Sequence, residues 1–134
     1  MADFLEQAGA VPYRWVEGQL QVLLVTSRSS GDWIVPKGMI DPGQNSQQTA
    51  LQEAYEEAGV RGELGPHLGV VHGSKRGYPI RVELFALHVR QQLSPWMEQD
   101  FRRRKWFEAD LAALQLARDP ALAELVKALR QSIR

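Results

Sequence analysis

The feature that most constrains this chain is an acidic helix in its middle. Residues 46–58 have helical spacing, Asn45 or Ser46 can cap the start, and Gly59 suits the end. The apolar residues of this helix share one arc, and its three glutamates share the neighbouring arc: Glu53, Glu56 and Glu57. These carboxylates repel one another, and the last turn of a helix disfavours negative charge. No Lys or Arg within the helix offsets this, so a bound cation explains the arrangement better than a solvated acidic face.

The expected cation is a hard divalent ion, because every candidate ligand is a carboxylate oxygen. Mg²⁺ is the first choice and Mn²⁺ the alternative. In proteins Mg²⁺ commonly binds one or two carboxylates, several waters and the phosphates of a substrate. The loop before the helix fits such a site, because Gly38 and Gly43 let the backbone approach a ligand and Lys37 adds positive charge.

Strand patterns surround this helix on both sides in the sequence. Short runs of apolar and β-branched residues, bounded by Gly, Pro, Asn and Ser, predict strands at 9–17, 20–27, 33–35, 68–74, 80–90 and 103–107. Residues 37–45 and 91–99 are expected to be loops, and helices are expected at 109–116 and 120–130. The predicted fold class is α/β, with a mixed β-sheet covered by helices on both faces. The length of 134 residues fits one domain, 1–134.

Composition excludes several classes of protein. The formal net charge is zero, with 16 basic and 16 acidic residues, so a general affinity for nucleic acid or for an anionic membrane is not expected. The absence of cysteine excludes disulfides and thiolate metal sites. The longest apolar run, 22–25, is far too short to span a membrane, and residues 1–10 lack a signal-peptide pattern, which predicts a cytoplasmic protein. A homodimer is compatible with the sequence.

The segment from Gly38 to Val60 resembles the Nudix box. That pattern is Gly, five residues, Glu, seven residues, Arg-Glu, an aliphatic residue, any residue, Glu-Glu, any residue, Gly and an aliphatic residue, and the spacing here matches throughout. The resemblance implies an α/β/α sandwich and a Mg²⁺-dependent hydrolase that cleaves a nucleoside diphosphate linked to another moiety, or a related polyphosphate. It also implies that Glu53, Glu56 and Glu57 are the metal-binding and catalytic residues.

Two positions depart from the box. Gln44 stands where the family has its first Glu, and Gln52 stands where it has Arg. An amide still donates and accepts hydrogen bonds, but weaker, neutral ones. One negative and one positive charge are lost together, so the local balance is kept. These changes leave a second hypothesis open, in which a Nudix fold binds a nucleotide or polyphosphate with weak or no turnover.

A shorter resemblance points to the substrate. Residues 33–38, 96–98 and 103–107 are similar to segments of diphosphoinositol polyphosphate phosphohydrolases and dinucleoside polyphosphate hydrolases. A small, highly anionic polyphosphate is therefore the expected partner. The candidate substrate-binding residues are Arg28, Lys37, Gly38 and Arg76. Glu98, in the predicted loop 91–99, is a candidate general base or additional ligand, and Gln44 and Gln52 are candidates to support the glutamates.

Overall fold

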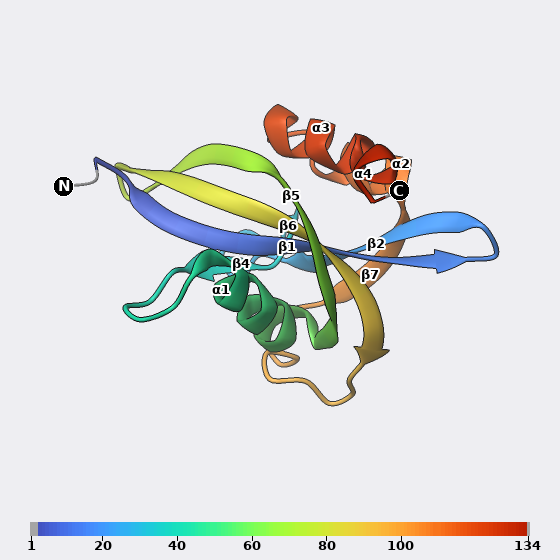
Figure 1. The fold of residues 1–134 in the computed structure, drawn as a ribbon. Coiled ribbons are helices and arrows are strands. Elements are labelled where there is room, and N and C mark those ends of the chain that lie inside the picture. Colours follow the sequence, from blue (N-terminus) through green and yellow to red (C-terminus); the bar gives the residue numbers. More distant parts are fainter. Residues whose placement is uncertain (1–2, 134) are drawn as a thin grey trace.

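The computed structural model describes residues 3–133, and within them it has helices on both faces of one mixed sheet (Figure 1). The strands are β1 (Leu5–Val16), β2 (Gln19–Thr26), β3 (Trp33–Ile34), β4 (Lys37–Met39), β5 (Val60–Lys75), β6 (Tyr78–Gln92) and β7 (Arg104–Glu108). The helices are α1 (Ser46–Glu53), which continues into a π-helical turn η1 (Ala54–Ala58), α2 (Ala109–Gln115), α3 (Pro120–Lys127) and α4 (Leu129–Ser132). The predicted α/β class with a mixed sheet is confirmed, although residues 1 and 134 of the predicted domain lie outside the described residues.

Strand β1 organises the sheet. It runs parallel to β6 along one edge, with Leu5 opposite Ile80 and Tyr13 opposite His88. Along its other edge it pairs antiparallel with β4 at one end and with β2 at the other. Strands β3 and β7 extend the sheet from β2, and β5 extends it from β6.

Strand β4 corrects the prediction that residues 37–45 form a loop. Its three residues pair with Gln7–Gly9 of β1. A side chain on Gly9 would collide with the carbonyl oxygen of Pro36, so the close approach of the two strands depends on this glycine. The result is that Lys37 and Gly38 are held in the sheet, beside α1.

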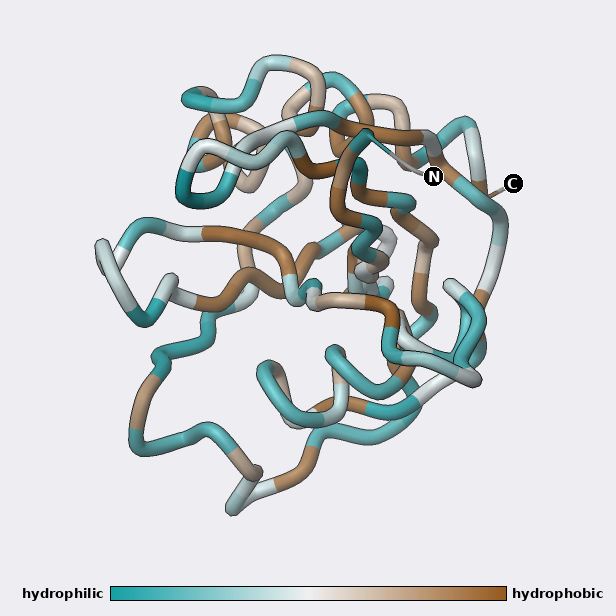
Figure 2. Tube along the Cα trace, turned by 90° about the vertical axis from the view of Figure 1, so that its left-hand side faces the viewer, coloured by the Kyte–Doolittle hydropathy of each residue, from teal (hydrophilic) through white to brown (hydrophobic). Residues whose placement is uncertain are grey.

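Two apolar clusters, one on each face of the sheet, form the core. Along β2, Val22 and Leu24 join the cluster under α2–α4, whereas Leu23 and Val25 join the cluster under α1. This alternation buries both faces of the strand. Figure 2 shows the same arrangement, with hydrophobic stretches through the middle of the molecule and largely hydrophilic loops at its margin. Helix α1 and η1 contribute only small side chains to the core, namely Ala50, Ala54 and Ala58, so the acidic helix packs close to the sheet.

Three other predicted boundaries were wrong. Strand β1 begins at Leu5 rather than at residue 9. Strand β5 begins at Val60 rather than at residue 68, because register shifts near Gly62, His67 and Gly69 let the glycines and Pro66 fit into an edge strand. The helix predicted over 120–130 is divided into α3 and α4, with Ala128 between them. No helix among residues 3–133 is long and apolar enough to cross a membrane.

Candidate active site

The acidic helix begins and ends at the predicted residues. The Asn45 side chain accepts a hydrogen bond from the Gln48 amide at 2.8 Å, and the Gln48 side chain accepts one from the Asn45 amide at 2.9 Å. This capping box fixes the start of α1. The helix widens into the π-helical turn η1 and ends at Gly59, which has a φ of 65°. Turns of this kind are rare and often occur at functional sites.

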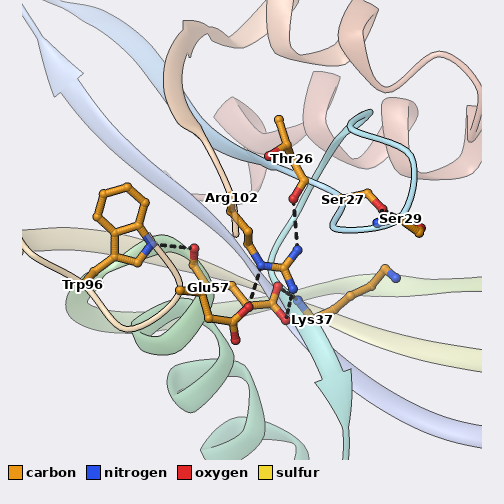
Figure 3. A network of polar contacts seen from close by, with 8 residues as sticks. Thr26, Ser27, Ser29, Lys37, Glu57, Trp96 and Arg102 are labelled. Atoms are coloured by element: carbon orange, nitrogen blue, oxygen red, sulfur yellow. Dashed lines mark hydrogen bonds and ion pairs between the residues drawn. The ribbon is translucent and has the colours of Figure 1, made fainter. Parts of the chain in front are cut away.

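Glu57 is the most buried glutamate of the helix, with 5% of the residue exposed. Its Oε1 accepts a hydrogen bond from the backbone amide of Lys37 at 3.2 Å, and its Oε2 lies 3.3 Å from Nη2 of Arg102 (Figure 3). The carboxylate of Glu53 lies against Gly38 so closely that any side chain there would collide with it. Glu53 and Glu57 therefore meet β4 side by side, and a side chain at position 38 would displace the Glu53 carboxylate.

Arg102 connects three parts of the site. Its Nε donates to Glu98 at 2.8 Å, and its Nη1 donates to the carbonyl oxygen of Thr26 at 3.0 Å. Arg102 begins a run of basic residues at 102–105, which the sequence alone does not distinguish from solvated surface. The structure instead makes it a buried ion-pair partner of Glu57 and Glu98. The i, i+4 spacing of Glu98 and Arg102 was the only sequence signal for this role.

The electrostatics of the site favour a proton or a cation at the glutamates. Burial raises the pKa of Glu57 to about 8, and this outweighs the opposing attraction of Arg102. Burial also raises the pKa of Glu53, and burial lowers the pKa of Lys37. Without a metal ion, the pair of carboxylates thus tends to retain a proton near neutral pH. A divalent cation would take the place of that proton.

Glu56 points to a different set of partners. Gln44 donates to Gln52 at 2.6 Å, and Gln52 donates to Glu56 at 2.8 Å. The two glutamines that replace the charged residues of the box are therefore bonded to each other and to a glutamate. Among residues 3–133, no three or more His, Asp or Glu side chains are arranged to hold a metal ion, because Glu56 faces Gln52 while Glu53 and Glu57 face β4.

A cleft of about 520 Å³ adjoins the Glu53–Glu57 pair. Of the predicted site residues it is lined by Arg28, Lys37, Gly38, Glu53 and Glu57, and the other lining residues include Gln7, Ser74, Lys75 and Arg102. The remaining predicted site residues, Gln44, Gln52, Glu56, Arg76 and Glu98, do not line it. A second cavity, of about 530 Å³ between β3 and the α2–α3 loop, shares Lys37 but includes no glutamate. The first cleft is therefore the candidate active site.

Two residues of the site escaped the sequence reasoning. Gln7 is buried and lines the cleft. Nothing in the sequence of β1 indicates that this position belongs to a site. Trp96 belongs to the segment 96–98 that supports the substrate resemblance, but its contact with the acidic helix was not predicted. Its indole Nε1 instead donates to the carbonyl oxygen of Glu57 at 3.1 Å, and Arg104 lies 3.8 Å over its ring.

Comparisons with known proteins agree with this geometry. Residues 7–129 match the family model of the NUDIX domain. The chain is 35% identical over 133 residues to Nudix hydrolase 21, chloroplastic, of Arabidopsis thaliana, covering 95% of this chain and 67% of the relative. It is 32% identical over 130 residues to diphosphoinositol polyphosphate phosphohydrolase 2 of Homo sapiens, covering 95% and 71%. The chain thus spans about two thirds of the length of these relatives.

Solved structures show the same fold. An Ap4A hydrolase of C. elegans, in a binary complex, superimposes with a TM-score of 0.75 at 26% identity, covering 95% of this chain and 96% of that chain. A NUDIX hydrolase from Nitrosomonas europaea has a TM-score of 0.77 at 20% identity, covering 97% and 90%. With the match over most of its length and the carboxylate pair of the box in place, this chain belongs to the Nudix hydrolase family, whose enzymes act on pyrophosphate bonds and generally use divalent metal ions.

Proposed function

We propose that this protein hydrolyses a phosphate anhydride in a polyphosphate substrate and depends on Mg²⁺, or alternatively Mn²⁺. The observation that carries the proposal is a pair of carboxylates, the buried Glu57 and the half-buried Glu53, at a cleft that basic residues also line. A buried negative pair without enough counter-charge is unfavourable unless a cation or proton joins it. Phosphate oxygens bound at the cleft would share such a cation with the carboxylates.

The residues present fit a hard divalent ion. The donors are carboxylate oxygens, and the missing side chain of Gly38 leaves the space in which the Glu53 carboxylate lies. Of the three glutamates predicted to bind the metal, we assign Glu53 and Glu57, with Glu57 as the principal ligand. Glu56 is bonded to Gln52 and does not line the cleft, so we assign it to support of the site. When bound, Mg²⁺ neutralises charge on phosphate oxygens and activates a water.

The chain's own residues supply the remaining functions. Lys37 and Arg28 line the cleft and bind phosphate oxygens of the substrate. Arg76 lies next to Lys75 at the β5–β6 turn, where it reaches only the outer part of a long substrate. Glu53, which lines the cleft, accepts the proton of the attacking water. Glu98 is already paired with Arg102, so we assign it to support of Glu57 rather than to proton transfer.

The proposed substrates are dinucleoside polyphosphates and diphosphoinositol polyphosphates. Relatives named for such substrates, the human phosphohydrolase and the C. elegans Ap4A hydrolase, support this choice. A screen with Mg²⁺ and Mn²⁺ should compare these two classes with ADP-ribose, nucleotide sugars and nucleoside triphosphates. We expect the highest kcat/KM for one of the first two classes, and no turnover in EDTA. Highest activity on a nucleotide sugar or on ADP-ribose would contradict the substrate assignment alone.

The alternative function is a polyphosphate-binding module with weak or no turnover. The neutral Gln44–Gln52 pair favours it, because both charged residues of the box are missing. Tight, metal-dependent binding of a polyphosphate without product release would support this alternative. A cytoplasmic location and a homodimer remain predictions, which cell fractionation and the solution mass would check.

A further inference from the structure

The C-terminal end of the acidic helix is bound from outside at every one of its final backbone carbonyls. Helices leave such carbonyls without internal partners, and solvent usually satisfies them. Here Leu93 N donates to Gly59 O at 2.8 Å, Trp96 Nε1 to Glu57 O at 3.1 Å, Glu98 N to Glu56 O at 3.1 Å, and Arg104 Nη1 to Ala58 O at 3.0 Å. All of these donors come from residues 93–104, which we call the clamp segment.

Trp96 and Arg104 form the centre of the clamp segment. The guanidinium of Arg104 lies 3.8 Å over the indole ring of Trp96, so each side chain holds the other in place. Gly59 makes room for both, because a Cβ there would lie 2.5 Å from Trp96 Cβ and 2.6 Å from Arg104 Nη1. The two side chains and the glycine therefore make one packed unit against the helix end.

The same segment also holds the carboxylate of Glu57. Trp96 binds the carbonyl of Glu57, Arg104 binds the carbonyl of the next residue, and Arg102 pairs with the Glu57 side chain. Neither Trp96 nor Arg104 lines the cleft, so neither is placed to contact substrate. The turn they bind is π-helical, a rare conformation that occurs mostly as a single turn within an α-helix.

We propose that Trp96 and Arg104 are positioning residues that set the place of Glu57 by holding the backbone of the π-helical turn. This inference rests on the proposed function, in which Glu57 binds the metal. Loss of either donor would leave the turn free to relax toward regular helix, which would move the Glu57 carboxylate relative to Gly38 and the Lys37 amide. Metal affinity and turnover would fall, while KM measured at saturating metal would not change.

The chain offers a matched control for the key variant. Trp106 also donates through Nε1, to Gln92 at 2.9 Å, and also lies under a guanidinium, that of Arg14 at 4.0 Å. It makes no such bond to the helix. Trp96→Phe and Trp106→Phe therefore remove similar bonds at different places.

The test measures Mn²⁺ binding by electron paramagnetic resonance without substrate, the melting temperature without metal, and kcat and KM with a polyphosphate. We expect Trp96→Phe to raise the Mn²⁺ Kd and lower kcat by roughly three- to tenfold, with KM unchanged. Trp106→Phe should leave the Mn²⁺ Kd and kcat at wild-type values, even if it lowers the melting temperature as much. Arg104→Lys keeps the positive charge, so its Mn²⁺ Kd and its kcat should lie between those of the wild type and those of Arg104→Ala.

Wild-type Mn²⁺ affinity and kcat in Trp96→Phe would overturn the positioning role. Equal effects of Trp96→Phe and Trp106→Phe would overturn it as well, since they would report general destabilisation. Glu57→Gln separates this inference from the proposed function. If Glu57→Gln keeps the wild-type Mn²⁺ Kd, the proposed metal site is wrong. If Glu57→Gln loses affinity and Trp96→Phe does not, only the positioning role is wrong.

Discussion

The guanidinium of Arg102 lies 3.3 Å from the buried carboxylate of Glu57, with only 9% and 7% of the two side chains exposed. Among residues 3–133, Arg102 is the positively charged residue that forms an ion pair with this carboxylate. It is held there from two sides, by Glu98 and by the carbonyl oxygen of Thr26. Removal of Arg102 would leave a buried carboxylate without its partner.

We therefore predict that Arg102→Met strongly destabilises the metal-free protein. Breaking a buried ion pair by removing one partner typically costs about 3–5 kcal/mol. The loss of unfolding free energy should be smaller at pH 6 than at pH 8, because a protonated Glu57 carries no charge for Arg102 to balance. Urea unfolding in EDTA at the two pH values measures both effects. Arg90→Met, which breaks the exposed Arg90–Glu63 pair, is the control and should cost below about 1 kcal/mol.

The pKa of Glu57 predicts how the stability of the metal-free protein changes with pH. Burial raises this pKa to about 8, whereas an unfolded glutamate titrates near pH 4.3. The folded state therefore binds more protons between these values, so stability falls as the pH rises from about 5 to 8. Melting temperatures in EDTA should be higher at pH 6 than at pH 8, and the dependence should be shallower in Glu57→Gln. An equal slope in both proteins would show that another group dominates.

Glu57→Gln also tests the proposed role of Glu57 in metal binding and catalysis. We expect turnover to fall by on the order of a hundredfold or more, because the principal metal ligand is lost. The fold should remain intact, since an amide can still accept the Lys37 backbone hydrogen bond. Circular dichroism, metal titration and steady-state rates test these points. Glu124→Gln, at an exposed site on α3, is a matched control that should retain wild-type turnover.

The sequence predicts those features of the site that depend on residues close together in the chain, and it misses those that depend on distant residues. The cap at Asn45, the end at Gly59 and the neighbouring positions of Glu53 and Glu57 are local features, and helical spacing was enough to predict them. The roles of Arg102 and Trp96 arise from contacts across 45 and 39 residues, which no local period contains. Strand β4 was missed for the same reason, because it exists only through its pairing with β1. The separation of Glu56 from Glu53 and Glu57 reflects the π-helical turn, which a regular helical wheel does not represent.

The bonded pair of Gln44 and Gln52 predicts coupled effects of substitution. Gln44 donates to Gln52, which in turn donates to Glu56, so a change in one glutamine alters the partner of the other. Gln44→Glu alone and Gln52→Arg alone should each help turnover less than the two together, because only the pair restores an ion pair. A double-mutant cycle in kcat and in unfolding free energy measures the coupling energy. Strictly additive effects would contradict the idea that the glutamines replace an ion pair.

The last prediction concerns the recognition of long phosphate chains by Lys37. Its backbone amide donates to Glu57, it is partly buried, and it lines the cleft together with Arg28 and Lys75. A substrate with more phosphates has more charged oxygens near these residues. Each additional phosphate can therefore form a further charge-assisted hydrogen bond. Lys37→Ala should therefore raise KM more for substrates with longer phosphate chains. Lys127→Ala, on α3 and away from the cleft, should leave KM unchanged.

The same contacts predict that kcat/KM of the wild type falls as the salt concentration rises, and that Lys37→Ala weakens this dependence. Steady-state rates for a series of polyphosphates of increasing length, each at low and high salt, test both statements. A KM increase that is equal for short and long substrates, with an unchanged salt dependence, would mean that Lys37 acts on the folded site rather than on the outer phosphates. The basic residues of the cleft would then not select polyphosphates by charge, and the substrate assignment would have to be replaced while the family assignment remains.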